Sequence, residues 1–167
     1  MTAPGAGGAA AHARVVGRLR DQAEDVSRLS SGLDEAQRSR RVQPEKWSLK
    51  ELVCHLLRVQ EVFERRLDAM LGEDNPPIVS YGPDGDAEFL RWAALPSEQS
   101  LEEYRRARRR LLERLEGLSA SDWHRAGRHP DYPRYDVHFA MEYLAHHEAH
   151  HIYQMYERRA SLAPLPH

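Results

Sequence analysis

Four long segments of this 167-residue chain carry apolar residues at helical spacing, and this pattern limits the possible folds more than any other feature. The segments run from about Ala9 to Leu33, from Leu49 to Met70, from Ser97 or Ser100 to about Leu118, and from about Asp136 to Arg159. Apolar residues three or four positions apart lie on one face of a helix. No segment shows the sustained alternation of a strand. The sequence therefore predicts an all-α fold, an antiparallel four-helix bundle with one or two longer crossover loops.

Capping residues mark the ends of the second long helix. Ser48 with Glu51 three positions later forms a capping box, and Gly72 is a typical helix end. The polar segment 34–47 is predicted to be a connector, and a short helix is expected around 86–95.

The chain shows no internal repeat and no change of composition that divides it into two domains. Residues 1–8 are rich in Ala and Gly and are predicted to form a flexible tail, followed by a single domain over 9–167. No basic and apolar leader opens the sequence, and no apolar run approaches the roughly 20 residues that cross a bilayer. We therefore expect a soluble, cytoplasmic protein with no membrane partner. The single cysteine, Cys54, excludes an internal disulfide and a multi-cysteine metal site.

The charge of the chain argues against a nucleic-acid-binding protein. Its net charge is −2, so the surface is not basic overall. One arginine run stands out, but glutamates surround it at spacings that allow salt bridges along the helix. We interpret the run as a solvated face; its members are Arg105, Arg106, Arg108, Arg109 and Arg110.

Histidine is the unusual component, because seven of the 10 histidines lie between His124 and His151. The last helix holds two pairs four residues apart, His146 with His150 and His147 with His151. Residues four apart stack on one helix face, so either pair could grip a metal ion. The apolar face of this helix decides between them. It places His147 and His151 at its edge, and the other pair toward solvent or a partner.

A third ligand is available from the second long helix. His55 lies on the flank of its apolar face, and packed helices approach within 8–10 Å. Three imidazoles with an open position are typical of catalytic zinc. A histidine on a helix flank is, however, more often an ordinary packed or exposed residue, and the pattern alone leaves both interpretations open.

Two motifs carry a resemblance to a known family. Residues 46–56 (KWSLKELVCHL) resemble the W-S-x-x-E-x-x-x-H-L signature of the DinB-like superfamily, and residues 143–154 are similar to its H-x-x-H-H-x-x-Q helix. That group includes YfiT-type metal-dependent hydrolases and thiol-dependent S-transferases and isomerases. The resemblance implies one divalent metal ion, usually zinc or nickel, held by His55, His147 and His151. It also implies a homodimer, with which the aromatic Phe139, Tyr153 and Tyr156 away from the main apolar face are consistent.

Further side chains admit two interpretations each. Glu51 could hold the ring of His55 or only cap its helix, and Glu148 could be a general base or a surface carboxylate. Cys54 should point away from the bundle centre, which argues against a catalytic role. Four aromatic residues near loops could line a pocket or simply pack: Trp92, Trp123, Tyr132 and Tyr135.

These observations predict a metal-dependent enzyme whose three-histidine site activates water or a low-molecular-weight thiol against a small electrophilic substrate. The alternative is a non-catalytic, stress-related metal-binding bundle. An interaction module without metal chemistry is disfavoured by the intact histidines. An open metal site facing a cavity would favour the enzyme.

Overall fold

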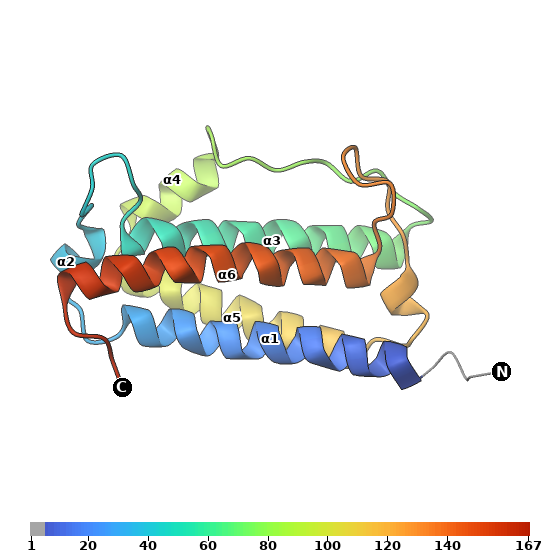
Figure 1. Ribbon diagram of the computed structural model, residues 1–167. Helices are drawn as coiled ribbons and strands as arrows, with labels where there is room; N and C mark the ends of the chain where they lie inside the picture. The colour runs from blue at the N-terminus through green and yellow to red at the C-terminus, as the bar shows by residue number, and fades with distance from the viewer. Residues whose placement is uncertain (1–5) are drawn as a thin grey trace.

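The computed structural model describes residues 6–167 and shows four long helices in one bundle (Figure 1). The described range holds no strand, only two isolated bridges between loops. The predicted all-α four-helix bundle is therefore confirmed. The elements are α1 (Ala6–Ser30), α2 (Glu35–Ser39), α3 (Leu49–Gly72), α4 (Ala87–Ala94), α5 (Ser97–Glu116), the 3-10 turn η1 (Asp122–His124) and α6 (Val137–Leu162).

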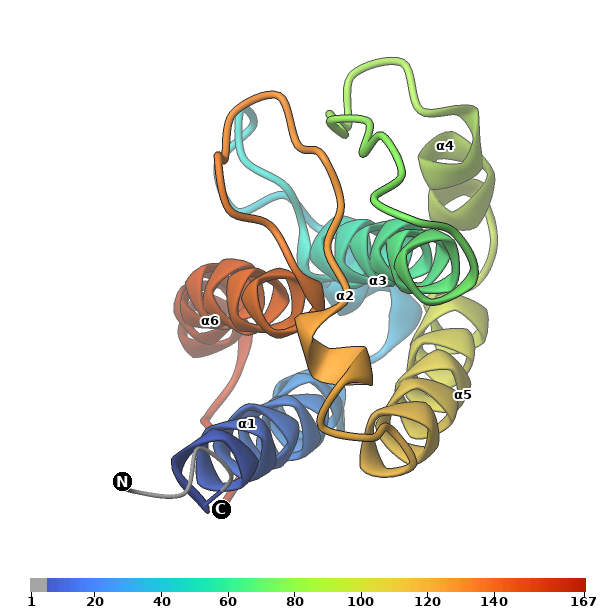
Figure 2. The same ribbon diagram turned by 90° about the vertical axis from the view of Figure 1, so that its right-hand side faces the viewer.

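The bundle is not antiparallel throughout, which corrects the sequence prediction. Seen from one end, α1 and α3 lie diagonally opposite, with α5 and α6 between them (Figure 2). Arg18 of α1 donates to Glu142 of α6, and one turn later Gln22 donates to the carbonyl of Ala145, so α1 and α6 run parallel. Helices α3 and α5 are also parallel, as two contacts between them show: Gln60 with Arg108, and Asp68 with Arg114.

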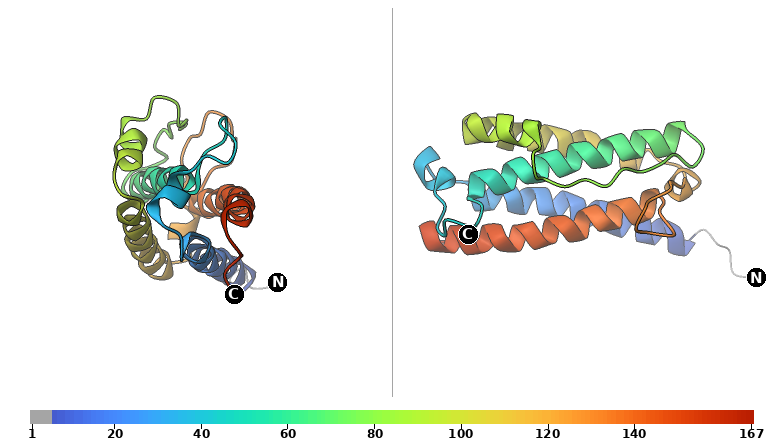
Figure 3. Two further views of the ribbon diagram at one scale, coloured as in Figure 1. Left: turned by 90° about the vertical axis from the view of Figure 1, so that its left-hand side faces the viewer. Right: turned by 90° about the horizontal axis from the view of Figure 1, so that it is seen from above.

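A long crossover makes this topology possible. After α3 the chain returns along the length of the bundle through residues 73–86 and α4 before α5 begins, as the view from above shows (Figure 3). A short turn would have forced α5 to run antiparallel to α3. The crossover instead lies along α3.

The helix starts match the expected caps in part. Ser48 Oγ accepts from the Glu51 amide at 3.2 Å and Glu51 Oε2 accepts from the Ser48 amide at 2.8 Å, so the predicted capping box is present. The cap expected for α5 is wrong: the helix starts at Ser97 behind Pro96, without a side-chain cap. Ser100 lies inside that helix and donates to the Ser97 carbonyl.

The first third of the chain is more helical than expected. Helix α1 starts at Ala6, inside the segment 1–8 expected to be a tail; residues 1–5 lie outside the described part. The helix ends at Ser30, before the left-handed Gly32 (φ +66°). The connector over 34–47 contains α2, because Asp34 forms a capping box that sequence analysis missed.

Helix α6 buries the predicted apolar face, including Val137, Met141 and Leu144. Phe139, expected away from that face, is partly buried against the core between two tyrosines. Tyr153 remains exposed, as expected.

A buried polar network lies at the centre of the bundle. The Arg108 guanidinium donates to Glu148 Oε1 at 2.9 Å, to Gln60 Oε1 at 2.7 Å and to the Leu19 carbonyl at 2.6 Å. Tyr104 donates to the same carboxylate at 2.8 Å, so all four long helices take part. Two predictions were wrong here. Arg108 is not part of a solvated face, and Glu148 is neither a surface carboxylate nor a free base, because each is needed to neutralise the other away from water.

The two crossover segments, residues 73–86 after α3 and residues 117–136 between α5 and α6, meet over α3 and α6, on the same side of the bundle (Figure 2). The Ile78 amide donates to the Arg128 carbonyl, and the Arg128 amide donates to the Pro76 carbonyl, both at 2.8 Å. Gly127 allows this approach, because a Cβ there would lie 2.8 Å from the Ile78 side chain. The paired loops cover the face on which the candidate site lies.

Among residues 6–167, no helix combines the length and apolarity needed to cross a membrane.

Candidate metal centre

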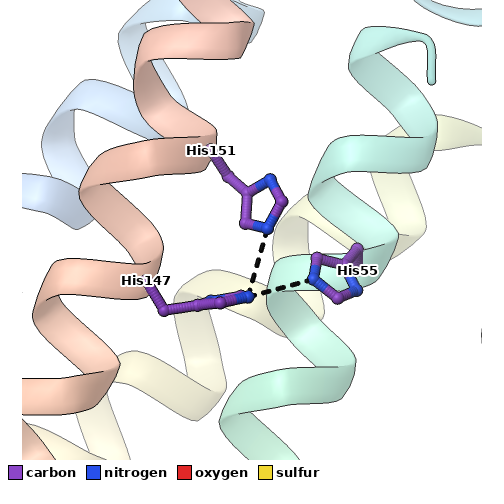
Figure 4. A group of neighbouring side chains, drawn as sticks. All are labelled: His55, His147 and His151. Carbon is purple, nitrogen blue, oxygen red and sulfur yellow. Dashed lines mark hydrogen bonds between the residues drawn. The ribbon is translucent and has the colours of Figure 1, made fainter. Parts of the chain in front are cut away.

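The structure brings the three predicted histidines together. His55 of α3 and His147 and His151 of α6 point their Nε2 atoms toward one another (Figure 4). Nε2 of His147 lies 3.3 Å from Nε2 of His55 and 3.1 Å from Nε2 of His151. One turn of α6 separates its two histidines, so both face α3.

Trp47, directly before the Ser48 cap, packs against the cluster. Its ring centroid lies 4.8 Å from that of His55 and 6.3 Å from that of His151. Its carbonyl accepts from Arg158 of α6 at 3.1 Å. The tryptophan thus links the start of α3 to α6 and shields one side of the imidazoles.

Burial keeps the imidazoles neutral. Loss of solvation, together with the smaller effect of the neighbouring imidazoles, lowers the pKa of His55 to about 3 and that of His147 to about 4. Burial also lowers the pKa of His151, although its hydrogen bond to Gln154 opposes the shift. Neutral imidazoles offer the lone pairs that metal ions require.

The hydrogen bonds also fit a metal ion. Nδ1 of His151 donates to Gln154 Oε1 at 2.8 Å, which leaves the lone pair on Nε2 of His151. Nε2 of His147 carries at most one hydrogen, so it cannot donate to the Nε2 atoms of both His55 and His151. A metal ion would instead accept the lone pairs of all three Nε2 atoms. The donor set suits zinc, nickel and similar ions, and it does not select among them.

A cavity of about 360 Å³ opens beside the histidines. Its walls are largely aromatic and come from α3, α6 and both crossovers; they include Phe63, Tyr81, Tyr132, Tyr135 and Tyr143. A cavity of this volume accommodates a small molecule. The three-histidine cluster therefore opens into a space that a small molecule can enter.

The family follows from comparison with known proteins. The sequence model of the DinB superfamily matches residues 18–155, most of the chain. The chain belongs to the DinB superfamily. A comparison with curated proteins gave no significant match.

Among solved structures, this DinB-superfamily chain is similar to YfiT from Bacillus subtilis, described as a probable metal-dependent hydrolase with an unusual four-helix bundle topology. The TM-score is 0.74 at 18% sequence identity, over 90% of this chain and 86% of YfiT. At that identity the likeness establishes the shared fold.

Other predicted site residues of this DinB-superfamily chain lie outside the cluster. Glu51 caps α3 and accepts from Arg41 Nε at 2.9 Å; it does not hold His55, whose Nδ1 has no partner among residues 6–167. His146 and His150 are exposed, on the side that sequence analysis assigned to them.

Cys54 is fully buried instead of pointing away from the bundle centre, because its helix is covered by α5 as well as α6. Burial raises the pKa of its thiol to about 11, so it stays protonated.

The four aromatic candidates divide into two groups. Tyr132 and Tyr135 line the cavity. Trp123 instead stacks on His12 of α1, with ring centroids 4.5 Å apart, and Trp92 lies on α4 under the Arg91 guanidinium. Neither tryptophan reaches the cavity.

Sequence analysis missed three residues that lie beside the histidines or line the cavity. Gln154 stands in the quoted motif, yet no role was assigned to it. Arg66 lies three helical turns after His55, a spacing of 11 residues that returns to the same face of α3 and could have revealed it. Tyr81 comes from a loop without regular structure, and no local pattern indicates that it lines the cavity.

Proposed function

We propose that this protein is a divalent-metal-dependent enzyme that activates water or a low-molecular-weight thiol against a small electrophilic substrate. Hydrolysis or thiol transfer is the reaction class. The proposed resident ion is one zinc or nickel per chain, held by His55, His147 and His151.

The observation that carries the proposal is the position of the three Nε2 atoms at the edge of the aromatic cavity. A structural metal site is normally closed by four protein ligands, whereas a catalytic site keeps a position open. Within residues 6–167 the cluster that could hold a metal ion consists of these histidines alone. The site therefore has room for a reacting molecule.

The proposed ion and the residues around it would contribute to the reaction in different ways. A divalent ion would lower the pKa of a bound water or thiol and polarise a carbonyl group. Gln154 fixes the ring of His151 by accepting from its Nδ1. Tyr81 donates to Asp86 at 2.7 Å, and Arg58 donates to the same carboxylate at 2.9 Å, which holds the phenol ring over the cavity near His55.

The second candidate is a non-catalytic metal-binding protein. The same three histidines support it, and the 18% identity to YfiT transfers no activity. The open cavity favours the enzyme, because a protein that only stores or senses the ion has no need of a substrate-sized space beside it.

The test starts with elemental analysis of the purified protein. Ester and amide hydrolysis and thiol addition to small electrophiles are then measured with zinc, with nickel and after chelation. We expect one ion per chain and turnover that chelation abolishes and reloading restores. His55→Ala should lose both the ion and the turnover while keeping its helical spectrum.

Two results would contradict the proposal. Full metal content and turnover in His55→Ala would exclude the three-histidine site. Stoichiometric metal without turnover across both reaction classes would favour the non-catalytic alternative.

A further inference from the structure

The cavity holds a second polar feature opposite the histidines. Along α3, His55, Val59, Phe63 and Arg66 fall on one helix face, and all four line the cavity. The stripe begins with a metal-ligand candidate, continues with apolar residues and ends with a guanidinium. A ligand lying along α3 would meet these three environments in turn.

The Arg66 side chain is buried in the wall of the cavity. Its exposed fraction is 9%, and among residues 6–167 no carboxylate oxygen lies within ion-pair distance. Nη1 donates to the Tyr135 hydroxyl at 3.1 Å and Nη2 to the Val79 carbonyl at 2.7 Å, while Nε has no partner in the described part of the chain. A buried, permanently charged group without a counter-ion is costly, and such groups are normally paired.

Nearby groups do not neutralise this charge. The Asp131 carboxylate lines the cavity but is mostly exposed, and it contacts Ser80 at 3.5 Å and His129 at 4.0 Å. Nδ1 of His129 accepts from the Asp131 amide, so the His129 ring is neutral and cannot serve as a counter-ion for Arg66. The remaining polar groups on this wall are tyrosine hydroxyls.

We propose that the substrate of this site carries a carboxylate that binds Arg66 at the end of the cavity away from the histidines. The inference rests on the proposed function, because it names the substrate class for the same cavity. A guanidinium offers several N–H donors in a planar fork that matches a carboxylate. The aromatic walls between the two ends would contact an apolar body.

The geometry of α3 limits the length of this ligand. Side chains on a helix lean toward its N-terminus, and Cζ of Arg66 lies 4.7 Å from the ring centroid of Phe63. Phe63 follows His55 by eight residues, a rise of about 12 Å along the axis. A small aryl-alkyl carboxylate spans most of such a distance, with its reactive group near the histidines.

Binding to metal-stripped protein tests the inference separately from the enzymatic proposal. The probes are 3-phenylpropionate and its neutral analogue 3-phenylpropionamide, titrated by calorimetry in the presence of a chelator. We expect the acid to bind about tenfold tighter or more, as for a hydrogen bond to a charged group. Arg66→Gln should remove this preference, and the matched control Arg65→Gln, one residue away and exposed, should keep it.

A second measurement does not depend on a variant. In the wild-type protein the acid, and not the amide, should shift the Nε–H resonance of Arg66. Equal affinities for the two probes, no binding of the acid, an unchanged preference in Arg66→Gln or an unmoved Nε–H resonance would each overturn the inference. A failure of the enzymatic proposal would instead appear as absent metal or turnover, with the acid preference intact.

Discussion

At the scale of single residues, the two histidine pairs of α6 differ in the side of the helix that they face. A step of about 100° per residue separates His146 from its neighbour His147 and His150 from its neighbour His151. One pair is exposed, whereas the other pair converges with His55. The position of each histidine on the helix therefore decides whether its ring can join the group that could hold a metal ion.

We predict that the exposed pair is dispensable for metal binding. The His146→Ala/His150→Ala protein should retain wild-type metal content, because neither ring belongs to the group of converging nitrogens. Metal content measured by elemental analysis is compared with that of His147→Ala/His151→Ala, which should be metal-free. The reverse pattern would show that α6 presents its other face to the metal.

Gln154 provides a prediction about orientation. Gln154→Leu removes the acceptor for Nδ1 of His151, so the ring no longer has a fixed tautomer. Metal affinity should fall about 10–100-fold, as is typical when such a supporting hydrogen bond is lost. Competition with a chromophoric chelator measures this, with the exposed neighbour change Tyr153→Phe as control. Equal affinity in both variants would mean that packing alone orients the ring.

At the scale of the helices, the Arg108–Glu148 pair connects the bundle through its core. Arg108→Met leaves the Glu148 carboxylate buried without a cation, and we expect a loss of about 3–5 kcal/mol in the free energy of unfolding. Adding Glu148→Leu should recover more than half of the loss, because the unpaired charge is then gone.

Urea unfolding followed by far-UV circular dichroism checks this prediction. Arg109→Met, on the exposed side of the same helix, should change the free energy of unfolding by about 0.5 kcal/mol or less. A double variant as unstable as Arg108→Met would show that the other hydrogen bonds of the guanidinium, not the charge pair, dominate.

At the scale of the whole molecule, the core and not the metal should hold the fold. The buried apolar side chains come from all four long helices, and a domain of this size folds without a structural ion. Chelation should therefore leave the helical spectrum unchanged. Restoring saturating metal should raise Tm by about 5–10 °C through mass action, and His55→Ala should lack this shift. Unfolding on chelation would contradict the prediction.

Homodimerisation stays a prediction. One of its original supports is gone, because Phe139 packs inside the chain, while Tyr153 and Tyr156 are exposed near the end of α6 with ring centroids 6.5 Å apart. Sedimentation at micromolar concentration should give twice the chain mass, and Tyr153→Ser/Tyr156→Ser should shift it toward the monomer. A monomeric wild-type protein would exclude the dimer.

The sequence by itself determined the long helices and the metal-ligand candidates, because both depend on local periodicity. Apolar spacing predicted α1, α3, α5 and α6, and the rotation of α6 selected His147 and His151 over the other pair. Even Arg66 could have been identified from the sequence, since it lies on the same face of α3 as His55.

Only the tertiary structure decided which residues meet across the bundle. Helix direction depends on the long crossover before α5, so the parallel neighbours could not be read from any segment alone. Burial of Arg108 with Glu148 also requires α5 and α6 to place opposite charges at the same level along the bundle. Periodicity reports which face of a helix is apolar, whereas the partner of a polar side chain is set by contacts between residues distant in sequence.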